Sequence, residues 1–580
     1  MEYESFYNSG TYFVPEMEVY AGWVSIAGSF AAGQVFTNQN EDVALLLAGE
    51  CFQDPESEIK RVRNGDSRAG NHASWLISLY EKVGVQFVEK LNGLFSGLLI
   101  DKGRRRAFLF NDRYGIERIY LCETKDGIYF ASEAKALLRV LTEARAFDER
   151  GVAQFLNFGC TLEWQTLFSG VQLIPGGSLW SFEGVNPHKG RYFLPKNWES
   201  QPALPPEEFE SRFQETFRRI LPRYFESQSK IGISLTGGLD TRMIMACRPE
   251  SRVKPVCYTF SGENVETLDA RLAARVAKAC GLEHRKLNIG ADFFSDFATY
   301  ADRTVHITDG CFGILGAHEI YFNQQARQLA PARLTGNFGS EILRGMSTFK
   351  PIGLSRQLFS PEVSRAADSS AEQLSRVEEC PVTFAAFKEI PWNLFGSLAA
   401  GRSQVTFRTP YLDNEVVALA FQAPEVLRRS PLVALRLVKN NNPLLSEIPT
   451  DRGYGWDARG VTYAARRLFC EATFKLDYIY SEGLPHLFAP LDTFIGRLSE
   501  VGVLGLHKYL PYRRWFRREL APYVKEILTD AQTRRMPYWN SDFLERMATE
   551  HISGRKNYVR EINAVLTLEA IERLLFRESP

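Results

Sequence analysis

Residues 233–243 read Ile-Ser-Leu-Thr-Gly-Gly-Leu-Asp-Thr-Arg-Met, and their types and spacing suit phosphate chemistry. Glycines between a strand and a helix let backbone N–H groups approach a phosphate, and the helix N-terminus adds a partial positive charge. Thr236 and Thr241 offer hydroxyl donors, and Asp240 is a hard oxygen ligand suited to Mg²⁺. The stretch lacks the Lys-Ser/Thr of the Walker loop and the GxGxxG spacing of dinucleotide folds. A plain strand–helix turn that needs its glycines for tight geometry stays open as the alternative.

The elements that must position this turn alternate between strands and helices. The apolar patterns predict helices over 208–225, 240–247 and 268–280, and strands over 230–235 and 253–260. Such alternation is typical of a parallel sheet with right-handed crossovers. Pro331–Leu334 leads into a further glycine-bearing turn, and the chain beyond about residue 350 is predicted to be mostly helical.

The N-terminal part has a different pattern. Residues 22–135 contain short apolar runs separated by turn signals, which predicts a strand-rich domain with a sandwich-like core. Proline and polar residues cluster at 192–205, where this domain is expected to end.

Bulk properties narrow the classes of function. A chain of 580 residues predicts two or three domains, and 69 basic against 69 acidic residues argues against a nucleic-acid partner. Nine cysteines without CxxC spacing suggest neither a zinc site nor a disulfide framework. The polar N-terminus does not resemble a signal peptide, and no run of about 18 apolar residues is present. We therefore expect a cytoplasmic protein without a membrane span, and a homodimer is left open.

Several segments, taken together, resemble one family. TGGLDT (236–241) resembles the SGGxDS loop of the ATP pyrophosphatases, which cleave ATP to AMP and pyrophosphate. Further matches follow in order: YTFSG (258–262), Asp269, Gly281, His284, TGNFGSEILRG (335–345, resembling SGEGSDE) and RTPYLD (408–413). Upstream, LYEKVG (79–84), LNGLFSGLLID (91–101), NDRYGIERIY (111–120), FASEAKAL (130–137) and TLFSGVQLIPGG (166–177) resemble a class II glutamine amidotransferase domain. The chain is thus similar to asparagine synthetases over roughly residues 20–460, with a weaker match at 562–577.

The resemblance implies a two-domain α/β fold. The first domain would be an Ntn-hydrolase-like αββα sandwich, and the second a doubly wound parallel-sheet ATP-pyrophosphatase domain with a helical C-terminal extension. The expected boundaries are 1–200 for the amidotransferase-like domain, 201–460 for the synthetase domain and 461–580 for its helical C-terminal part.

The resemblance also implies an activity and a set of site residues. The expected enzyme is an ATP-dependent, AMP-forming amide ligase that adenylates a small-molecule or peptide carboxylate and couples it to ammonia or a substrate amine. It would serve asparagine, natural-product or polysaccharide biosynthesis. Expected nucleotide contacts are Ser234, Thr236, Gly237, Gly238, Leu239, Asp240, Thr241, Phe260, Thr335 and Gly336. The expected Mg²⁺ ligands are Asp240 and Glu341, and the expected catalytic residues are Asp240, Glu341 and Arg452.

Three of these side chains keep a second interpretation. Phe260 either walls the adenine or packs in the core, and Arg452 either stabilises pyrophosphate or forms a surface salt bridge. Arg242, directly after the loop, either binds a substrate carboxylate or phosphate as a fork or pairs with a nearby acid.

The family pattern fails at the expected glutaminase. Its nucleophilic cysteine aligns with Ala21, behind twenty further residues, and its Asn-Gly-Glu aligns with Ala48-Gly49-Glu50. Its glutamine-holding Ser-Asp-x-Glu aligns with Asn71-His72-Ala73-Ser74. These changes imply that the domain does not hydrolyse glutamine, as in the β-lactam synthetases and lasso-peptide cyclases, which lost the cysteine. Cys51 is expected to be a buried structural residue.

The synthetase motifs are also altered. The family's metal-binding Asp aligns with Ser340, beside Glu341, and its active-site Glu aligns with Asn337. No lysine stands at 448–453, near the position of the family's late catalytic lysine. A catalytically inactive scaffold or binding protein is therefore the alternative function.

Overall fold

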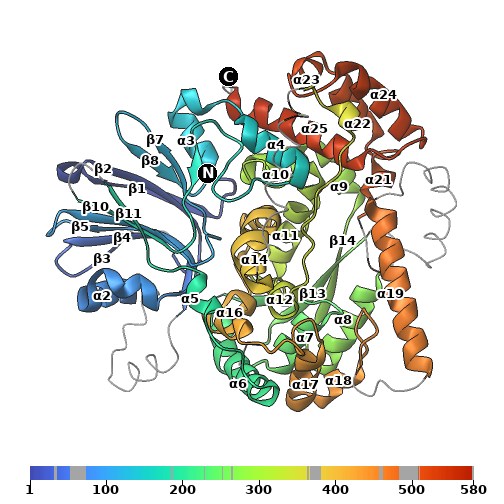
Figure 1. The fold of residues 1–580 in the computed structure, drawn as a ribbon, viewed down its shortest axis with the longest axis horizontal. Helices are drawn as coiled ribbons and strands as arrows, with labels where there is room; N and C mark the ends of the chain where they lie inside the picture. Colours follow the sequence, from blue (N-terminus) through green and yellow to red (C-terminus); the bar gives the residue numbers. More distant parts are fainter. Residues whose placement is uncertain are drawn as a thin grey trace.

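The computed structural model describes residues 1–31, 35–52, 73–183, 187–227, 229–250, 253–262, 266–361, 363, 365, 380–455, 461–482, 507 and 510–577. Its strands gather into two regions (Figure 1). Antiparallel strands fill the N-terminal part, and one parallel sheet lies in the part that follows residue 230.

The N-terminal part is built on a six-stranded antiparallel sheet of order β11-β10-β6-β5-β4-β3. Its strands are β3 (Phe36–Thr37), β4 (Val43–Phe52), β5 (Asn92–Asp101), β6 (Arg106–Asn111), β10 (Ser178–Phe182) and β11 (Pro187–Arg191). A three-stranded sheet combines β7 (Tyr120–Glu123), β8 (Ile128–Ala131) and β9 (Gln172–Leu173), and β1 (Tyr7–Val14) forms a hairpin with β2 (Val19–Ile26).

Alternation along the strands gives the large sheet two apolar faces, because successive side chains point to opposite sides. Leu45 and Leu99 pack on one face with helix α2 (Ser74–Val83). Leu46 and Leu98 pack on the other face with residues of the β1–β2 hairpin and of β7. Helix α3 (Ala134–Val140) contacts β7 and β8, which completes an α-β-β-α order of layers.

The second part is built on a five-stranded parallel sheet of order β14-β13-β12-β15-β16. Its strands are β12 (Ile231–Ser234), β13 (Val256–Ser261), β14 (His284–Asn288), β15 (Ala332–Thr335) and β16 (Thr406–Arg408). The chain moves outward from β12 to β14 and then returns to the other side of β12 at β15. The direction of winding therefore reverses between β12 and β15, and ligands of open α/β sheets bind outside the strand carboxyl ends at such a point.

Helices cover both faces of this sheet. Buried residues of β12, β13 and β15 pack on one face with α6 (Pro206–Phe225), α7 (Leu239–Ala246), α8 (Leu268–Ala279), α16 (Asn414–Phe421) and α17 (Leu432–Asn441). On the other face, Tyr258 and Phe260 pack with α10 (Phe297–Ile307) and α11 (Ala317–Leu329). The predicted fold class, an α/β chain with an αββα sandwich and a doubly wound parallel sheet, is confirmed.

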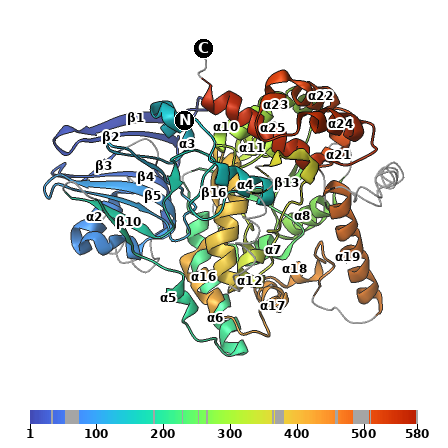
Figure 2. The same cartoon turned by 45° about the horizontal axis from the view of Figure 1, so that its top comes forward.

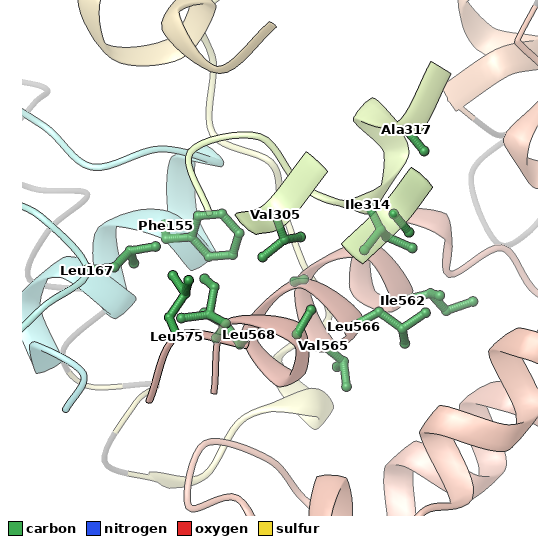
Figure 3. Close-up of a cluster of buried hydrophobic side chains, with 14 of the residues drawn as sticks. Phe155, Leu167, Val305, Ile314, Ala317, Ile562, Val565, Leu566, Leu568 and Leu575 are labelled. Carbon is green, nitrogen blue, oxygen red and sulfur yellow. The ribbon is translucent and has the colours of Figure 1, made fainter. Parts of the chain in front are cut away.

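The C-terminal helix α25 (Val559–Ile571) joins the two parts through one buried cluster. Leu566 and Leu568 of α25 lie among Phe155, Val305 and Ile314 (Figure 3). Phe155 belongs to α4 (Glu149–Phe158) of the N-terminal part, whereas Val305 belongs to α10. By contrast, α19 (Val461–Glu482) lies on the far side from the N-terminal sheets in both views (Figure 1, Figure 2).

Buried ion pairs also connect the two parts. Arg408 of β16 donates to both oxygens of Glu50 of β4, at 2.8 and 2.9 Å. Lys135 of α3 donates to Asp309 at 2.9 Å, with both side chains buried. Because each charge would be costly to bury alone, these pairs hold the parts in register.

In the described part of the chain, no helix combines the length and apolar character needed to cross a membrane. The domain boundaries at 200/201 and 460/461 stay predictions.

We expect Glu50→Ala to lower stability by about 3–5 kcal/mol, because Arg408 would keep a buried, uncompensated charge. Thermal unfolding followed by circular dichroism measures the shift, and adding Arg408→Met should restore part of it. The matched control is Glu183→Ala, which removes the solvent-exposed partner of Arg106 and should change little. A Glu50→Ala protein with the wild-type melting temperature contradicts this role.

Candidate functional site

The predicted phosphate loop lies at the carboxyl end of β12. Ser234 is the last residue of β12 and Leu239 is the first of α7. The turn is closed by its threonines, since the Thr236 and Thr241 hydroxyls lie 3.0 Å apart and the Gly238 N–H donates to Thr236 Oγ1 at 3.3 Å. The Leu239 side chain is buried in the core, so only its backbone is available to a ligand.

The second glycine-bearing turn follows β15 and presses against the first turn of α7. A Cβ atom on Gly336 would lie 2.6 Å from the Thr241 nitrogen, and one on Gly339 would lie 2.6 Å from Asp240 Cγ. Only glycine permits this approach. The structure therefore brings Thr236, Thr241 and Gly336 together, and their contact with a nucleotide stays a prediction.

The Asp240 carboxylate already has partners within the chain. Ser340 Oγ donates to its Oδ2 at 2.8 Å. Arg344 Nη2 donates to Oδ1 at 2.9 Å and to Oδ2 at 3.0 Å. Tyr411 donates its hydroxyl to the Asp240 carbonyl at 2.6 Å, which fixes the start of α7.

Two acidic residues flank the peptide of Gly237. Its N–H donates to Asp269 Oδ1 at 2.8 Å, and its carbonyl accepts from the Asp451 N–H at 3.3 Å. Burial raises the pKa of Asp269 to about 7; the Asp451 charge adds to this shift, and the Gly237 N–H opposes it. A carboxyl group of α8 whose pKa lies near neutrality is thus bonded to the loop backbone.

Glu341 is the second predicted magnesium ligand and lies on α12 (Gly339–Arg344). The pKa of its carboxyl is raised to about 7, chiefly by burial and also by the Asp240 and Glu389 charges, while a backbone hydrogen bond and Arg344 oppose the shift. Glu341 therefore shares its surroundings with Asp240.

The hydrogen bonds of Arg242 go to backbone carbonyls rather than to an acid, although the charge of the nearby Asp451 acts on its guanidinium. Its side chain is 2% exposed and donates to backbone carbonyls of the 445–449 segment and to Gly237. Burial lowers its pKa to about 10. The two terminal nitrogens of the guanidinium thus connect residues 445–449 to Gly237 of the phosphate loop. The carbonyls of Ile448 and Pro449 need such a donor, because they lie beyond the end of α18 (Pro443–Glu447).

A cavity of about 600 Å³ opens beside the loop. Its walls come from both parts of the molecule, among them Phe155, Phe158, Asp269, Lys350, Asp451, Phe474 and Arg560. Arg452 stacks on the wall residue Phe474, with 3.3 Å between the guanidinium carbon and the ring centroid. The cavity is of a size that holds a small organic molecule.

The remaining predicted contacts lie close to the loops but have local partners. Ser234 Oγ accepts from Arg333 at 3.1 Å, and Thr335 Oγ1 donates to Asn337 at 2.8 Å. Phe260 is 9% exposed and stacks on Phe322, with centroids 4.6 Å apart.

Sequence reasoning missed several residues of this site. Arg344 stands inside the segment TGNFGSEILRG, and its spacing of four from Ser340 places both on one helix face. That spacing was an available signal for the Arg344–Ser340 contact. No comparable signal linked Lys350, Asp451 and Arg560 to the cavity, because they come from segments far apart in the chain.

The N-terminal part carries the altered amidotransferase positions. Ala21 lies within β2 and pairs with Tyr12 of β1. Glu50 is engaged by Arg408, and Cys51 is 2% exposed with a pKa raised by burial. Glu50 lines a cavity of about 250 Å³ together with Ala48 and Gly49. Asn71 and His72 lie outside the described residues, and Ala73 is buried.

Family models match both parts of the chain. A glutamine amidotransferase domain matches residues 19–193, and an asparagine synthase domain matches residues 212–389 and 507–573. The chain belongs to the asparagine synthetase-like family. The second model resumes at 507, in agreement with the packing of α25 against α10.

Several proteins named asparagine synthetase match this chain at low sequence identity. Asparagine synthetase 1 of Bacillus subtilis is 20% identical over 92% of this chain and 86% of its own length. Asparagine synthetase 2 of the same organism is 22% identical over 54% of this chain, and the human asparagine synthetase is 28% identical over 36%. These two matches span 44% and 37% of those relatives.

Solved structures give only distant likenesses. A structure of the allosteric regulatory enzyme of purine biosynthesis is 12% identical, with a TM-score of 0.21 over 46% of this chain and 66% of its own. NMN synthetase from Francisella tularensis is 12% identical, with a TM-score of 0.18 over 31% of this chain and 76% of its own.

Replacing Arg242 by Leu should release the 448–455 segment. The carbonyls of Ile448, Pro449 and Gly237 would lose a donor, so amide exchange in that segment should become about tenfold faster or more, corresponding to about 1.4 kcal/mol. Hydrogen exchange read by mass spectrometry measures it. Arg271→Leu, at an exposed arginine of α8, is the control. Equal exchange in wild type and Arg242→Leu would refute the fastening role.

Asp269→Asn should change the pH dependence of stability. A carboxyl whose folded pKa is raised stabilises fully below its unfolded pKa of about 4, and that contribution is lost as pH rises through about 7. Asn keeps an acceptor for the Gly237 N–H but does not titrate. Relative to wild type, the variant's melting temperature should therefore rise between about pH 5 and about pH 8. Asp126→Asn, at an exposed carboxylate, should show no such trend, and parallel pH profiles for Asp269→Asn and wild type would contradict the assignment.

Proposed function

We propose that the chain is an ATP-dependent, AMP-forming amide ligase that adenylates a substrate carboxylate and does not hydrolyse glutamine itself. The observation that carries this proposal is the meeting of the two glycine turns at the carboxyl ends of β12 and β15. The cavity next to these turns supports it, because an adenylating enzyme must hold an organic acid beside its nucleotide. Family membership supports the ATP-dependent amide chemistry.

In the first half-reaction, a carboxylate oxygen attacks the α-phosphorus of ATP. A new acyl–phosphate bond forms, the bond between the α- and β-phosphates breaks, and pyrophosphate leaves with the electron pair. Backbone N–H groups of Gly237, Gly238 and Leu239, with the Thr236 and Thr241 hydroxyls, would bear the developing charge. Ser234, Thr335 and Gly336 would border the nucleotide, and Phe260 the adenine side.

Magnesium would enter with ATP and neutralise phosphate charge. Glu341 fits as a ligand, because a carboxyl with a pKa of about 7 ionises readily beside a cation. Asp240 does not fit in the arrangement described, since Arg344 and Ser340 already bond both of its oxygens. Arg452, beside the loop on Phe474, is the candidate for stabilising the leaving pyrophosphate.

In the second half-reaction, an amine nitrogen attacks the acyl carbon, an amide bond forms and AMP leaves. The Asp269 carboxylate lies in the same cavity and would take the proton that the amine loses. Lys350 and Arg560 border the cavity and suit an acidic substrate.

The amine would come from ammonia or from the substrate rather than from glutamine. Ala21 has no nucleophilic side chain and lies inside a paired strand, so no terminal amine is present there to act as a base. Cys51 is buried and holds its proton, which makes it unsuitable as a replacement nucleophile.

One observation favours the alternative of an inactive scaffold. The groups that should meet phosphate are already bonded within the chain, Gly237 N–H to Asp269 and Asp240 to Arg344. A ligand must displace or join these bonds, whereas a scaffold would keep them.

Pyrophosphate exchange into ATP should depend on one carboxylic acid from a panel of acids and short peptides. Asp240→Ala should reduce exchange at least about a hundredfold, because it removes the acid that orients Arg344 and the first turn of α7. Amide formation should then require ammonium or a substrate amine, and glutamine should not replace either.

Asp542→Ala, at an exposed acid of α24 (Ser541–Ile552), is the control for exchange. If calorimetry detects no ATP binding by the wild type, the scaffold alternative is favoured. If Asp240→Ala keeps full pyrophosphate exchange, Asp240 has no role in adenylation.

A further inference from the structure

The strongest feature that the predicted activity leaves unexplained is the arginine on Asp240. The Arg344 and Asp240 side chains are 11% and 16% exposed, so the pair is largely withdrawn from water. Arg344 Nη2 bonds both carboxylate oxygens and also Ser340 Oγ, at 2.5 Å. The guanidinium is thus held by two side chains from the two loops that form the crevice.

A second observation points to a ligand at this guanidinium. Within the part of the chain that the structure describes, Arg344 Nη1 is buried and has no hydrogen-bond acceptor. A buried unsatisfied donor of a charged group costs roughly 1–3 kcal/mol or more, so this atom needs an acceptor to be stable. The other terminal nitrogen of this guanidinium is fixed on the Asp240 carboxylate and the Ser340 hydroxyl, and a phosphate oxygen is an acceptor that suits the free side of the fork.

The same geometry opposes a metal ion at Asp240. Mg²⁺ binds carboxylate oxygen at about 2.0–2.1 Å with near-octahedral geometry. A guanidinium already lies 2.9–3.0 Å from both oxygens of Asp240. Two cations on one carboxylate would repel each other strongly in a partly buried site. Ser340, which supplies no charge, does not offset this repulsion.

We propose that Arg344 is this chain's built-in cation for the polyphosphate of the nucleotide, held by Asp240 and Ser340 at the position that a metal ion on Asp240 would take. Asp240 then acts as a positioning residue for Arg344 rather than as a metal ligand. This inference rests on the proposed nucleotide site. It means that Arg344 of α12 stabilises the negative charge of the leaving pyrophosphate. Magnesium carried by ATP is needed less for binding than it would be if Asp240 held it.

Binding of ATP and of inorganic pyrophosphate, each measured by calorimetry with EDTA and with MgCl₂, tests the role of Arg344. Wild type should bind both ligands in EDTA within about tenfold of its affinity in magnesium. Arg344→Met should lose at least about tenfold in EDTA, and Arg344→Lys should recover part of the loss because it restores the charge. Arg573→Met is the matched control, since Arg573 forms a bidentate pair with Asp302, at 2.7 and 2.8 Å, in another part of the molecule.

Manganese binding without nucleotide, read by electron paramagnetic resonance, tests the metal half of the inference. Wild type should lack a site that depends on Asp240, and the double variant Arg344→Met with Ser340→Asp should gain one. A wild-type Mn²⁺ site that disappears in Asp240→Asn overturns the inference, whatever ATP does.

The inference is also overturned if wild type and Arg344→Met bind ATP and pyrophosphate with equal affinity in EDTA. In that case, ATP binding in magnesium would still support the proposed function. No ATP binding in either buffer contradicts the proposed function and this inference together. Circular dichroism and melting temperature of each variant separate these outcomes from misfolding.

Discussion

The reversal of strand order between β12 and β15 is the constraint on which the site depends. Right-handed crossovers send the helices after β12 and β13 to one face of the sheet and those after β14 to the other. β12 and β15 are neighbouring parallel strands at the ordinary spacing of about 4.8 Å, so the turns that follow them start side by side, and the helices α7 and α12 then pack in one buried cluster. Gly336, with no side chain, lets the second loop contact the first, so Asp240 and Arg344 can meet although they are 104 residues apart.

The amidotransferase-like part contributes to this site through its packing against the synthetase-like part. Its helix α4 supplies Phe155 and Phe158 to the cavity beside the phosphate loop, and α25 packs against the same helix. Glu50, next to the altered oxyanion position, is bonded to Arg408 of the strand that ends the parallel sheet. This domain therefore forms part of the wall of the cavity, and its contacts with α25 and β16 hold that wall in place.

The sequence allowed the fold and the loop to be predicted because both depend on local pattern. Alternation in 43–47 and 95–100, and the strand–Gly-Gly–helix order at 230–247, require only short-range regularity. The charge partners could not be predicted, because Arg344–Asp240, Arg408–Glu50 and Gly237–Asp269 join distant segments through the tertiary fold. The hydrogen bonds of Arg242 could not be predicted for the same reason, because they depend on residues 445–449, some 200 positions away in the sequence.

Two bonds in the loop decide how it can accept a polyphosphate. Gly237 N–H is bonded to Asp269 and Asp240 is bonded to Arg344, so both groups are satisfied before a ligand arrives. An anion beside Asp269 would raise its already elevated pKa further, because a like charge disfavours the ionised form. Polyphosphate binding should therefore be linked to proton uptake near neutral pH, which removes the nearest repulsive charge and weakens the hold of Asp269 on Gly237. Asp269 can then accept the proton of the amine only after pyrophosphate has left and its carboxyl has ionised again. Arg344 needs no such exchange, since its Nη1, which has no acceptor among the described residues, can bond a phosphate while Nη2 stays on Asp240.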